Sequence, residues 1–467
     1  MGDSDSLGSK EKLAEENLIA IYHMHARIPT KKITLKEAQE LQTDTLGFVM
    51  KVAAEMGDFS KIKVGFWDIY FANHPDYIQH IFLDNWKNYS RETFQFNQFA
   101  RVTGRGLLTT HGNYWQHHRR MLQPGFHRLK LDGMALNMSA AIERMHSRWD
   151  QQLANQSSIE LDIDSEMLRL GLEIVGAALF SIDFSRNSAE LSQEILSMMQ
   201  YVVYRSQNLL ALPTFVPTSR NRQFKRTLKK IDTIIYKMIT SRQASGISQN
   251  DLLDMLLSGR DENNKPLAAE AMRNEIITMI IAGYETVATG MVWMWDLLGR
   301  HSVVETKIQQ EINQNGLGDG AQALSNLPYT TAAIDEVFRL YPPSWLITRR
   351  AISQAQIGEF ILPARSIVVV CPFAIHHHSS FWKDHQSFNP ERWLFDYTNF
   401  KKFSYIPFGG GPHLCIGQPF ARLEAGLTLV KTLQRFRLKH IDHSPLDLLP
   451  QVTLRPKNPL KMKLHRL

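Results

Sequence analysis

Cysteine is scarce in this sequence: only Cys371 and Cys415 occur in 467 residues. That scarcity excludes a disulfide framework and favours a reducing compartment. Charge of one sign is also scarce, because 53 basic against 46 acidic residues leave only +7, and no basic tract is interleaved with aromatic residues. Binding to nucleic acid is therefore not expected. No apolar run near the N-terminus is long enough to span a bilayer, so we expect no membrane span and a cytoplasmic protein.

The chain does have the composition of a large folded interior, with 43% hydrophobic residues, 24 Phe and 18 Met. Helical patterns dominate near 85–340 and 375–440, whereas strand patterns occur near 61–73, 345–373 and 448–467. We expect a mainly α fold with a small β-rich subdomain. A polar, partly ordered segment at 1–35 is expected to precede a single domain at 36–467.

The segment Phe408-Gly-Gly-Gly-Pro-His-Leu-Cys415-Ile-Gly417 is the most informative part of the sequence. Its consecutive glycines allow positive φ and close approach to a flat ligand. Cys415 stands just before a predicted helix, 418–436, whose N-terminal N–H groups favour an anion. One thiolate cannot complete a tetrahedral zinc site, but it can be the axial ligand of a haem, with His413 placed to meet an acidic group at the haem edge. The alternative is a glycine-rich turn beside a core thiol.

A proline-free apolar stretch, 267–301, predicts a long helix through the middle of the protein. It contains Ala282-Gly283-Tyr-Glu285-Thr286, in which Ala282 and Thr286 lie one turn apart. The small residues permit close approach of a flat ligand. Thr286, with the Glu285 carboxylate beside it, is suited to binding water and delivering protons. The alternative is an incidental glycine and a threonine bonded to its own helix.

A shorter predicted helix, 330–340, contains Glu336-Val-Phe-Arg339, whose i, i+3 spacing lets the carboxylate meet the guanidinium. The apolar flanks indicate burial. Arg392, in Pro-Glu-Arg392-Trp, is expected to complete a buried triad with a structural role.

Trp115 and Arg119 are spaced i, i+4, which places an indole N–H beside a guanidinium and suits a carboxylate. The alternative is an exposed basic start of a helix. The histidine run 376–378 with His385 suggests zinc, but successive residues cannot all face one ion and no acidic ligand is suitably spaced, so a metal site is not expected there.

Together these motifs resemble the cytochrome P450 family, in the family's order and over nearly the whole chain from about residue 61. The resemblance implies the family's mostly helical fold, a b-type haem (iron protoporphyrin IX) and a monooxygenase reaction in which one atom of O₂ enters the substrate. Cys415 would hold the iron, and thiolate donation favours O–O cleavage. Thr286 and Glu285 would activate oxygen and relay protons. The remaining cofactor contacts implied are Trp115, Arg119, Arg349 and His413 at the propionates, Ala282 and Gly283 above the haem, and Phe408, Gly409 and Gly417 in the cysteine loop.

Because no reductase module is visible, the resemblance implies a separate electron donor, a ferredoxin or flavodoxin with its reductase, and a soluble bacterial type of enzyme. Basic residues around 115–130 and Arg422 are candidate docking charges for an acidic partner. Two alternatives keep the haem but change the reaction: peroxide-driven oxidation and oxidative coupling. A third is a haem-binding sensor without turnover.

The substrate is expected to be an apolar small molecule, but the sequence does not identify it. Apolar segments that could line its pocket also resemble ordinary core. The candidates are Phe94, Phe96, Phe99, Met279, Trp345, Leu346 and Val452.

Overall fold

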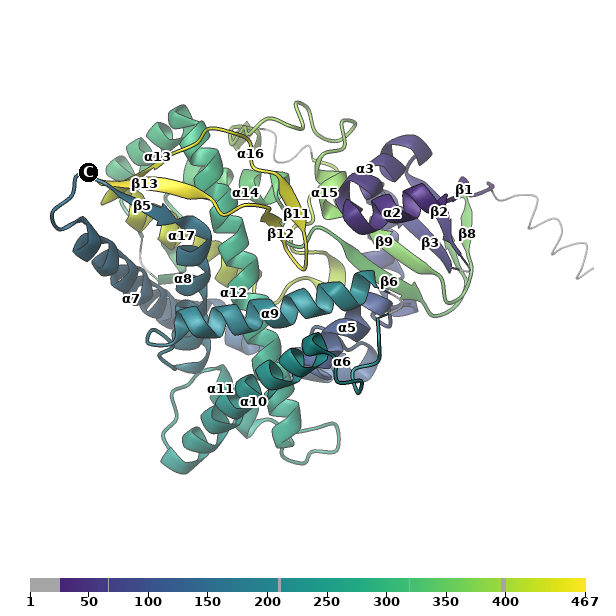
Figure 1. Ribbon diagram of the computed structural model, residues 1–467, viewed down its shortest axis with the longest axis horizontal. Coiled ribbons are helices and arrows are strands. Elements are labelled where there is room, and N and C mark those ends of the chain that lie inside the picture. The colour runs from purple at the N-terminus through teal and green to yellow at the C-terminus, as the bar shows by residue number, and fades with distance from the viewer. Residues whose placement is uncertain (1–25, 66, 209–210, 319, 396–399) are drawn as a thin grey trace, which may run out of the picture.

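The fold is built around one long central helix, α12 (Ala269–Arg300), in a computed structural model that describes residues 26–65, 67–208, 211–318, 320–395 and 400–467 (Figure 1). This helix matches the predicted stretch 267–301. It is long and apolar enough to cross a membrane, but 83% of its most apolar window is buried inside the protein. Helix α8 (Ile163–Phe180) packs so closely that a Cβ on Gly171 would lie 3.0 Å from the Tyr284 carbonyl oxygen. The helix is therefore a core element.

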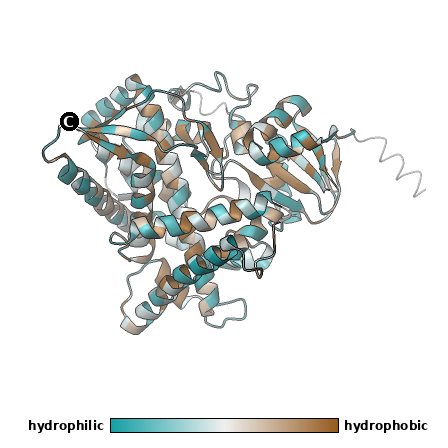
Figure 2. Cartoon of the chain, in the orientation of Figure 1, coloured by the Kyte–Doolittle hydropathy of each residue, from teal (hydrophilic) through white to brown (hydrophobic). Residues whose placement is uncertain are grey.

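The other helices surround α12 and the fold is mainly α, as the sequence predicts. Figure 2 shows that the outward turns of α7 (Arg128–Leu153) are mostly hydrophilic, while the strands of the largest sheet are mostly hydrophobic. These helices are α2 (Leu35–Thr43), α3 (Thr45–Met56), α4 (Pro75–Gln79), α5 (Phe94–Thr103), α6 (Gly112–Leu122), α7 (Arg128–Leu153), α9 (Ser188–Gln207), α10 (Ser219–Ser245), α11 (Leu252–Ser258), α13 (Ser302–Asn315), α14 (Pro328–Leu340), α15 (Pro372–His376), α16 (Arg392–Phe395) and α17 (Gln418–Leu433).

The largest sheet has six strands in the order β1-β2-β3-β9-β6-β4, and it joins the beginning of the chain to its middle. Its strands are β1 (Thr30–Lys32), β2 (Phe59–Val64), β3 (Trp67–Ala72), β9 (Ile367–Val370), β6 (Ile347–Ala351) and β4 (Tyr89–Ser90). The smaller sheets are β10 (Phe436–His440), β13 (Lys461–Arg466) and β5 (Ile159–Asp162); β11 (Leu448–Pro450) with β12 (Leu454–Pro456); and β7 (Ala355–Ile357) with β8 (Phe360–Leu362).

The two ranges expected to be helical contain strands that the sequence analysis missed. Strands β4 and β5 lie within 85–340, and β10 lies within 375–440, so the helix predicted for 418–436 ends at Leu433. Strand β5 pairs with β13 across about 300 residues, with Ile159 opposite Leu464. A pattern read in a short window does not detect such a distant partner. The single-domain division at residue 36 stays a prediction, and residues 1–25 lie outside the described part.

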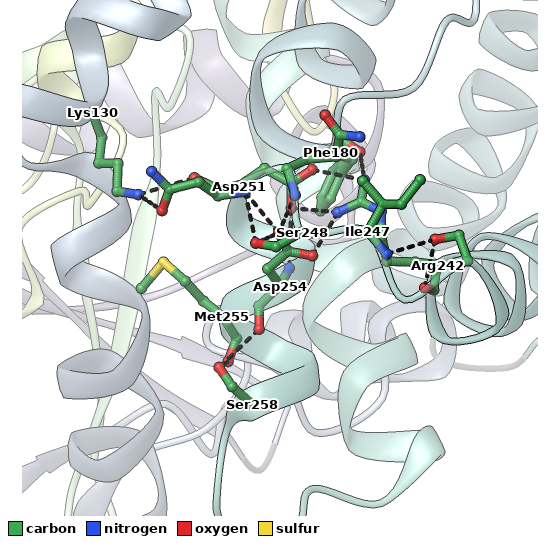
Figure 3. A network of polar contacts seen from close by, with 12 residues as sticks. Lys130, Phe180, Arg242, Ile247, Ser248, Asp251, Asp254, Met255 and Ser258 are labelled. Atoms are coloured by element: carbon green, nitrogen blue, oxygen red, sulfur yellow. Dashed lines mark hydrogen bonds and ion pairs between the residues drawn. The ribbon is translucent and has the colours of Figure 1, made fainter.

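The turn between α10 and α11 is fixed by a polar network (Figure 3). Arg242 on α10 donates to Asp251 and Asp254 at 2.9 and 2.7 Å, and its other nitrogen donates to the Phe180 carbonyl at 2.8 Å. Lys130 on α7 donates to the Asn250 carbonyl at 2.9 Å. Four helices therefore meet at one short turn.

A buried ionic cluster holds α14 to the first residues of α16. The Glu336 carboxylate accepts hydrogen bonds from Arg339 at 2.8 Å, from Arg392 at 2.9 Å and from the Trp393 indole at 2.9 Å. Glu336 and Arg339 have no solvent exposure. The structure thus brings together the three residues expected to form a triad, and Trp393 joins them.

The histidine run links this cluster to the cysteine loop. His376 donates from Nδ1 to the Arg339 carbonyl at 3.0 Å and accepts at Nε2 from the Ile406 N–H at 2.8 Å. Burial lowers the pKa of His376, so the ring is neutral, as these two bonds require. Among the described residues, no group of three or more His, Cys, Asp or Glu is arranged to hold a metal ion.

Replacing Glu336 by Gln should destabilise the fold by about 3–5 kcal/mol, because two buried guanidinium groups then lose their counter-charge. The matched control is Glu160→Gln, which removes an exposed ion pair with Lys461 at 3.2 Å and should cost at most about 1 kcal/mol. Urea unfolding at pH 7 measures both values. Equal losses in the two variants would show that the cluster does not stabilise the fold.

Candidate active site

One cavity lies between α12 and the loop that carries Cys415, and it brings together most of the predicted site residues. The arrangement places the small residues of α12 opposite the cysteine. The predicted residues on the cavity wall are Phe96, Trp115, Arg119, Met279, Ala282, Gly283, Thr286, Arg349, Phe408, Gly409, His413, Cys415 and Gly417.

The cysteine loop takes its shape from glycines at two positions of positive φ, Gly409 at 74° and Gly411 at 63°. A Cβ on Gly411 would lie 1.8 Å from the Phe82 carbonyl oxygen, so only glycine fits there. The loop closes through a 3.0 Å hydrogen bond from the Cys415 N–H to the Phe408 carbonyl. Cys415 is thereby held three residues before α17 with its side chain free.

The Cys415 thiol is exposed to the cavity, and the protein around the cavity desolvates it. Burial raises its pKa, while the Gly417 N–H, Arg119 and Arg91 act in the opposite direction. The thiol therefore stays protonated until a metal replaces the proton. A single accessible sulfur at a cavity wall matches an axial haem ligand better than a structural metal site.

On the opposite wall, α12 presents Ala282, Gly283, Thr286 and Val287 to the cavity. The Thr286 hydroxyl donates to the Ala282 carbonyl of its own helix at 2.7 Å. The alternative of a back-bonded threonine is thus present, yet Thr286 also faces the cavity. Because the hydroxyl hydrogen is engaged, the oxygen offers its lone pairs to a donor in the cavity.

Glu285 does not accompany Thr286 into the cavity. Its carboxylate accepts a hydrogen bond from the Thr453 hydroxyl at 2.9 Å, and its other oxygen has no partner among the described residues. Neighbouring helical residues point about 100° apart, which explains why the expectation of a carboxylate beside the Thr286 hydroxyl is wrong. Burial raises the pKa of Glu285, so the carboxyl holds its proton more tightly than usual.

The edge of the cavity carries unbalanced positive charge. Three arginines line it: Arg91, Arg119 and Arg349. Within the described chain, none of the three has a carboxylate within 4.0 Å. Arg91 donates to the Leu107 carbonyl at 2.6 Å, and Arg349 donates to the Thr348 carbonyl at 2.9 Å.

Burial lowers the pKa of all three guanidinium groups. Burial lowers the pKa of Arg349 to about 10. Burial, and then repulsion from Arg349 and Arg119, lowers the pKa of Arg91. His413 stacks near Trp115, with ring centroids 3.9 Å apart, and burial followed by repulsion from Arg91 lowers its pKa.

This wall fits the two propionates of a haem. Carboxylates placed here would neutralise the buried arginines and accept charge-assisted hydrogen bonds, and the unpartnered Nε of Arg91 and Nδ1 of His413 are available to them. The small residues of α12 leave room for a flat ring, and Cys415 faces it from the other side. The profile of the family described as Cytochrome P450 matches residues 30–464. The chain belongs to the cytochrome P450 family.

Several curated P450 relatives match over most of the chain. Cyclooctatin synthase from Streptomyces melanosporofaciens is 29% identical over 87% of this chain and 88% of its own length. Pentalenene oxygenase from Streptomyces avermitilis is 28% identical over 86% and 88%. Cytokinin hydroxylase from Arabidopsis thaliana is 30% identical over 78% and 72%. Like its family, this P450 is a haem b monooxygenase, an oxidoreductase that acts with O₂, a substrate and a redox partner.

Arg91 is a charged site residue that the sequence analysis missed. It follows the two-residue strand β4 and precedes Glu92, so in the sequence it resembles half of an ordinary surface ion pair. In the structure it is buried on the cavity wall of the P450. No local pattern signals this position, because the burial comes from distant segments.

The predicted substrate-pocket residues divide into two groups. Phe96 and Met279 line the P450 cavity, whereas Phe94 is 40% exposed on the surface. The others lie outside the cavity wall, since the packing of neighbouring elements turns them into the core or toward the β11–β12 turn: Phe99, Trp345, Leu346 and Val452. Apolar residues that the sequence analysis did not name complete the wall: Leu107, Leu108, Phe126, Leu179, Val287, Phe338 and Ile347.

Arg349 lines the cavity and its neighbour Arg350 does not, so comparing variants of the two tests whether binding of a propionate requires Arg349 or only a positive charge nearby. Arg350 only bonds to the Arg365 and Glu92 carbonyls at 3.4 Å near the surface. Losing one charged hydrogen bond costs about 1.5–3 kcal/mol, so Arg349→Ala should release haem roughly ten- to a hundredfold faster. Arg350→Ala should release it at nearly the wild-type rate. Transfer of haem to apomyoglobin measures both, and equal rates would remove Arg349 from the propionate site.

Proposed function

We propose that this P450 inserts oxygen into an apolar small molecule, with electrons from a separate ferredoxin or flavodoxin. The observation that carries the proposal is the apolar wall around Thr286, formed by residues such as Phe96, Leu179 and Met279. Such a wall binds hydrocarbon surface and offers few polar groups for orientation. Two relatives are named for an alkene and an unsaturated alcohol, pentalenene oxygenase and cyclooctat-9-en-7-ol 5-monooxygenase, and an alicyclic substrate of this kind suits the cavity.

In this proposal each residue has a defined task. Haem, when bound, supplies the activation of O₂. Cys415 holds the iron, while Trp115, Arg119, Arg349 and His413, joined by Arg91, hold the propionates. Ala282 and Gly283 keep the space above the ring open, and Phe408, Gly409 and Gly417 shape the cysteine loop.

The Thr286 oxygen accepts a hydrogen bond from a proton donor, such as a water molecule, and so holds that donor in the cavity. Its bond to the Ala282 carbonyl fixes the hydroxyl in that acceptor orientation. Glu285 contributes protons from the buried side of α12 beside Thr453, through water or a change of rotamer.

We propose that the electron donor is acidic and docks beside α6. Arg120 and Arg128 are exposed there, next to the cavity-lining Arg119. Arg422 is less suitable than the sequence suggested, because it forms an ion pair with Asp335 at 2.7 Å. We also place the protein in the cytoplasm, as a soluble enzyme of the bacterial type, which suits its two free cysteines.

The function is tested with a panel of unsaturated hydrocarbons and alcohols, a surrogate ferredoxin and reductase, and ¹⁸O₂. One ¹⁸O atom should appear in the product for each O₂ consumed in productive turnover. Product that lacks the label, or that forms only when peroxide replaces the electron donor, would contradict the proposal.

Thr286→Ala should retain substrate binding but lower the product formed per electron by about tenfold or more, with peroxide released instead. The alanine variant lacks the hydroxyl oxygen that accepts a hydrogen bond from the proton donor, so the donor is no longer held in the cavity. Thr286→Ser keeps a hydroxyl and should restore much of the coupling. Product and peroxide are measured together against NADPH consumed. Unchanged coupling in the alanine variant would exclude the role given to Thr286.

A further inference from the structure

A buried carboxylate, Glu275, continues the stripe of α12 residues that faces the cavity. Met279, Ala282 and Thr286 line the cavity, and Glu275 lies on the same face of the helix, one turn before Met279. Its side chain has no solvent exposure. Buried carboxylates are paired or hydrogen-bonded in folded proteins, so the partners of Glu275 indicate its role.

Glu275 binds the backbone of a segment of the cavity wall. Its Oε2 accepts a hydrogen bond from the Leu107 N–H at 3.0 Å. Leu107 and Leu108, in the turn between α5 and α6, line the cavity, and we call this pair the leucine wall. The other carboxylate oxygen lies 2.8 Å from Nδ1 of His118 on α6, a side chain that is also buried. One carboxylate therefore fastens both the leucine wall and α6 to α12.

Arg91 holds the leucine wall from the other side. Its Nη1 donates to the Leu107 carbonyl at 2.6 Å and to the Leu108 carbonyl at 3.1 Å. The N–H and the carbonyl of Leu107 are thus both bonded to charged side chains that are buried. Hydrogen bonds to charged groups are stronger than neutral ones, so the backbone here has little freedom to move.

The turn that carries the leucine wall packs directly on α12. A Cβ on Gly106 would lie 2.2 Å from the Thr278 hydroxyl oxygen, so only glycine allows this approach. Thr278 lies about one turn before Ala282 and also lines the cavity. The leucine wall therefore lies beside the part of α12 that leads to Thr286.

We propose that Glu275 is a positioning residue for the substrate: through the Leu107 N–H it fixes the leucine wall, which holds the apolar substrate beside α12. This inference rests on the proposed function, since it concerns how an apolar small molecule is held for oxidation. An apolar cavity offers few polar groups that orient a ligand, so the shape of its wall decides how the substrate lies. A turn without its anchor would admit several orientations.

The first test measures ligand binding and not turnover. Imidazole and 4-phenylimidazole both bind the iron of the haem-loaded protein through a nitrogen, and only the second places a phenyl group in the apolar part of the cavity. In Glu275→Gln the single amide oxygen cannot accept from both Leu107 and His118. The preference for 4-phenylimidazole over imidazole should then fall by about tenfold, as expected when one apolar contact is misplaced. Absorption titrations give both dissociation constants, and that of imidazole should be nearly unchanged.

Glu270→Gln is the matched control, because Glu270 is exposed in the first turn of the same helix. Its ligand preference should equal that of the wild type. Leu107→Ala shortens the leucine wall directly. If Glu275 acts through Leu107, Glu275→Gln should change the preference little once Leu107 is Ala, so the two effects are not additive. A carboxylate that only stabilises the fold would give additive effects.

The second test follows hydrogen exchange of the Leu107 amide, resolved to single residues by fragmentation mass spectrometry. The exchange should be slow in the wild type and at least about tenfold faster in Glu275→Gln, because the amide loses its acceptor. Glu270→Gln should exchange at the wild-type rate. If Glu275→Gln fails to hold haem, the wild-type exchange rate still tests the bond to Leu107.

Three outcomes would overturn the inference: rapid exchange of the Leu107 amide in the wild type, an unchanged ligand preference in Glu275→Gln, or additive effects with Leu107→Ala. Failure of the proposed function is distinguishable from all three. In that case no labelled product forms, while ligand preference and amide exchange still differ between Glu275→Gln and Glu270→Gln.

Discussion

The positive charge of three arginines at the edge of one cavity, two of them buried, is the constraint on which the rest of this structure depends. Arg91, Arg119 and Arg349 come from three separate parts of the chain, and none of them has a carboxylate partner in the described residues. A fold that buries such charge is complete only with an anion in place. The two propionates of a haem would supply that anion, and Cys415 would hold its iron. Binding of the cofactor and folding of this region are therefore coupled.

The scaffold keeps this site rigid from a distance. The Glu336 cluster fixes the end of α14, and His376 connects that helix to Ile406, two residues before Phe408. The cysteine loop then needs little more than its glycines and the bond from Cys415 to Phe408 to hold its shape. On the other wall, α12 packs closely against α8, which holds that side of the cavity in place.

The parts of this site whose functional residues lie close together in short sequence motifs could be predicted from the sequence. The cysteine loop, the Ala282–Thr286 turn and the Glu336 helix each place their groups through local geometry, so spacing alone was informative. Features set by distant contacts were not predictable. Arg91 is buried by segments far along the chain, β5 pairs with a strand about 300 residues away, and the direction of Glu285 depends on Thr453. The prediction of the pocket-lining residues was mostly wrong for the same reason, since apolar residues of the core and of a cavity cannot be distinguished in a sequence.

The central claim is that Cys415 is the thiolate ligand of a haem in this cavity. The absorption spectrum of the reduced protein with carbon monoxide tests it most directly, because the position of the Soret band reports the axial ligand. The account predicts the red-shifted band of thiolate ligation in the wild type and its loss in Cys415→His. An unshifted band in the wild type, of the kind given by a histidine ligand, would contradict it.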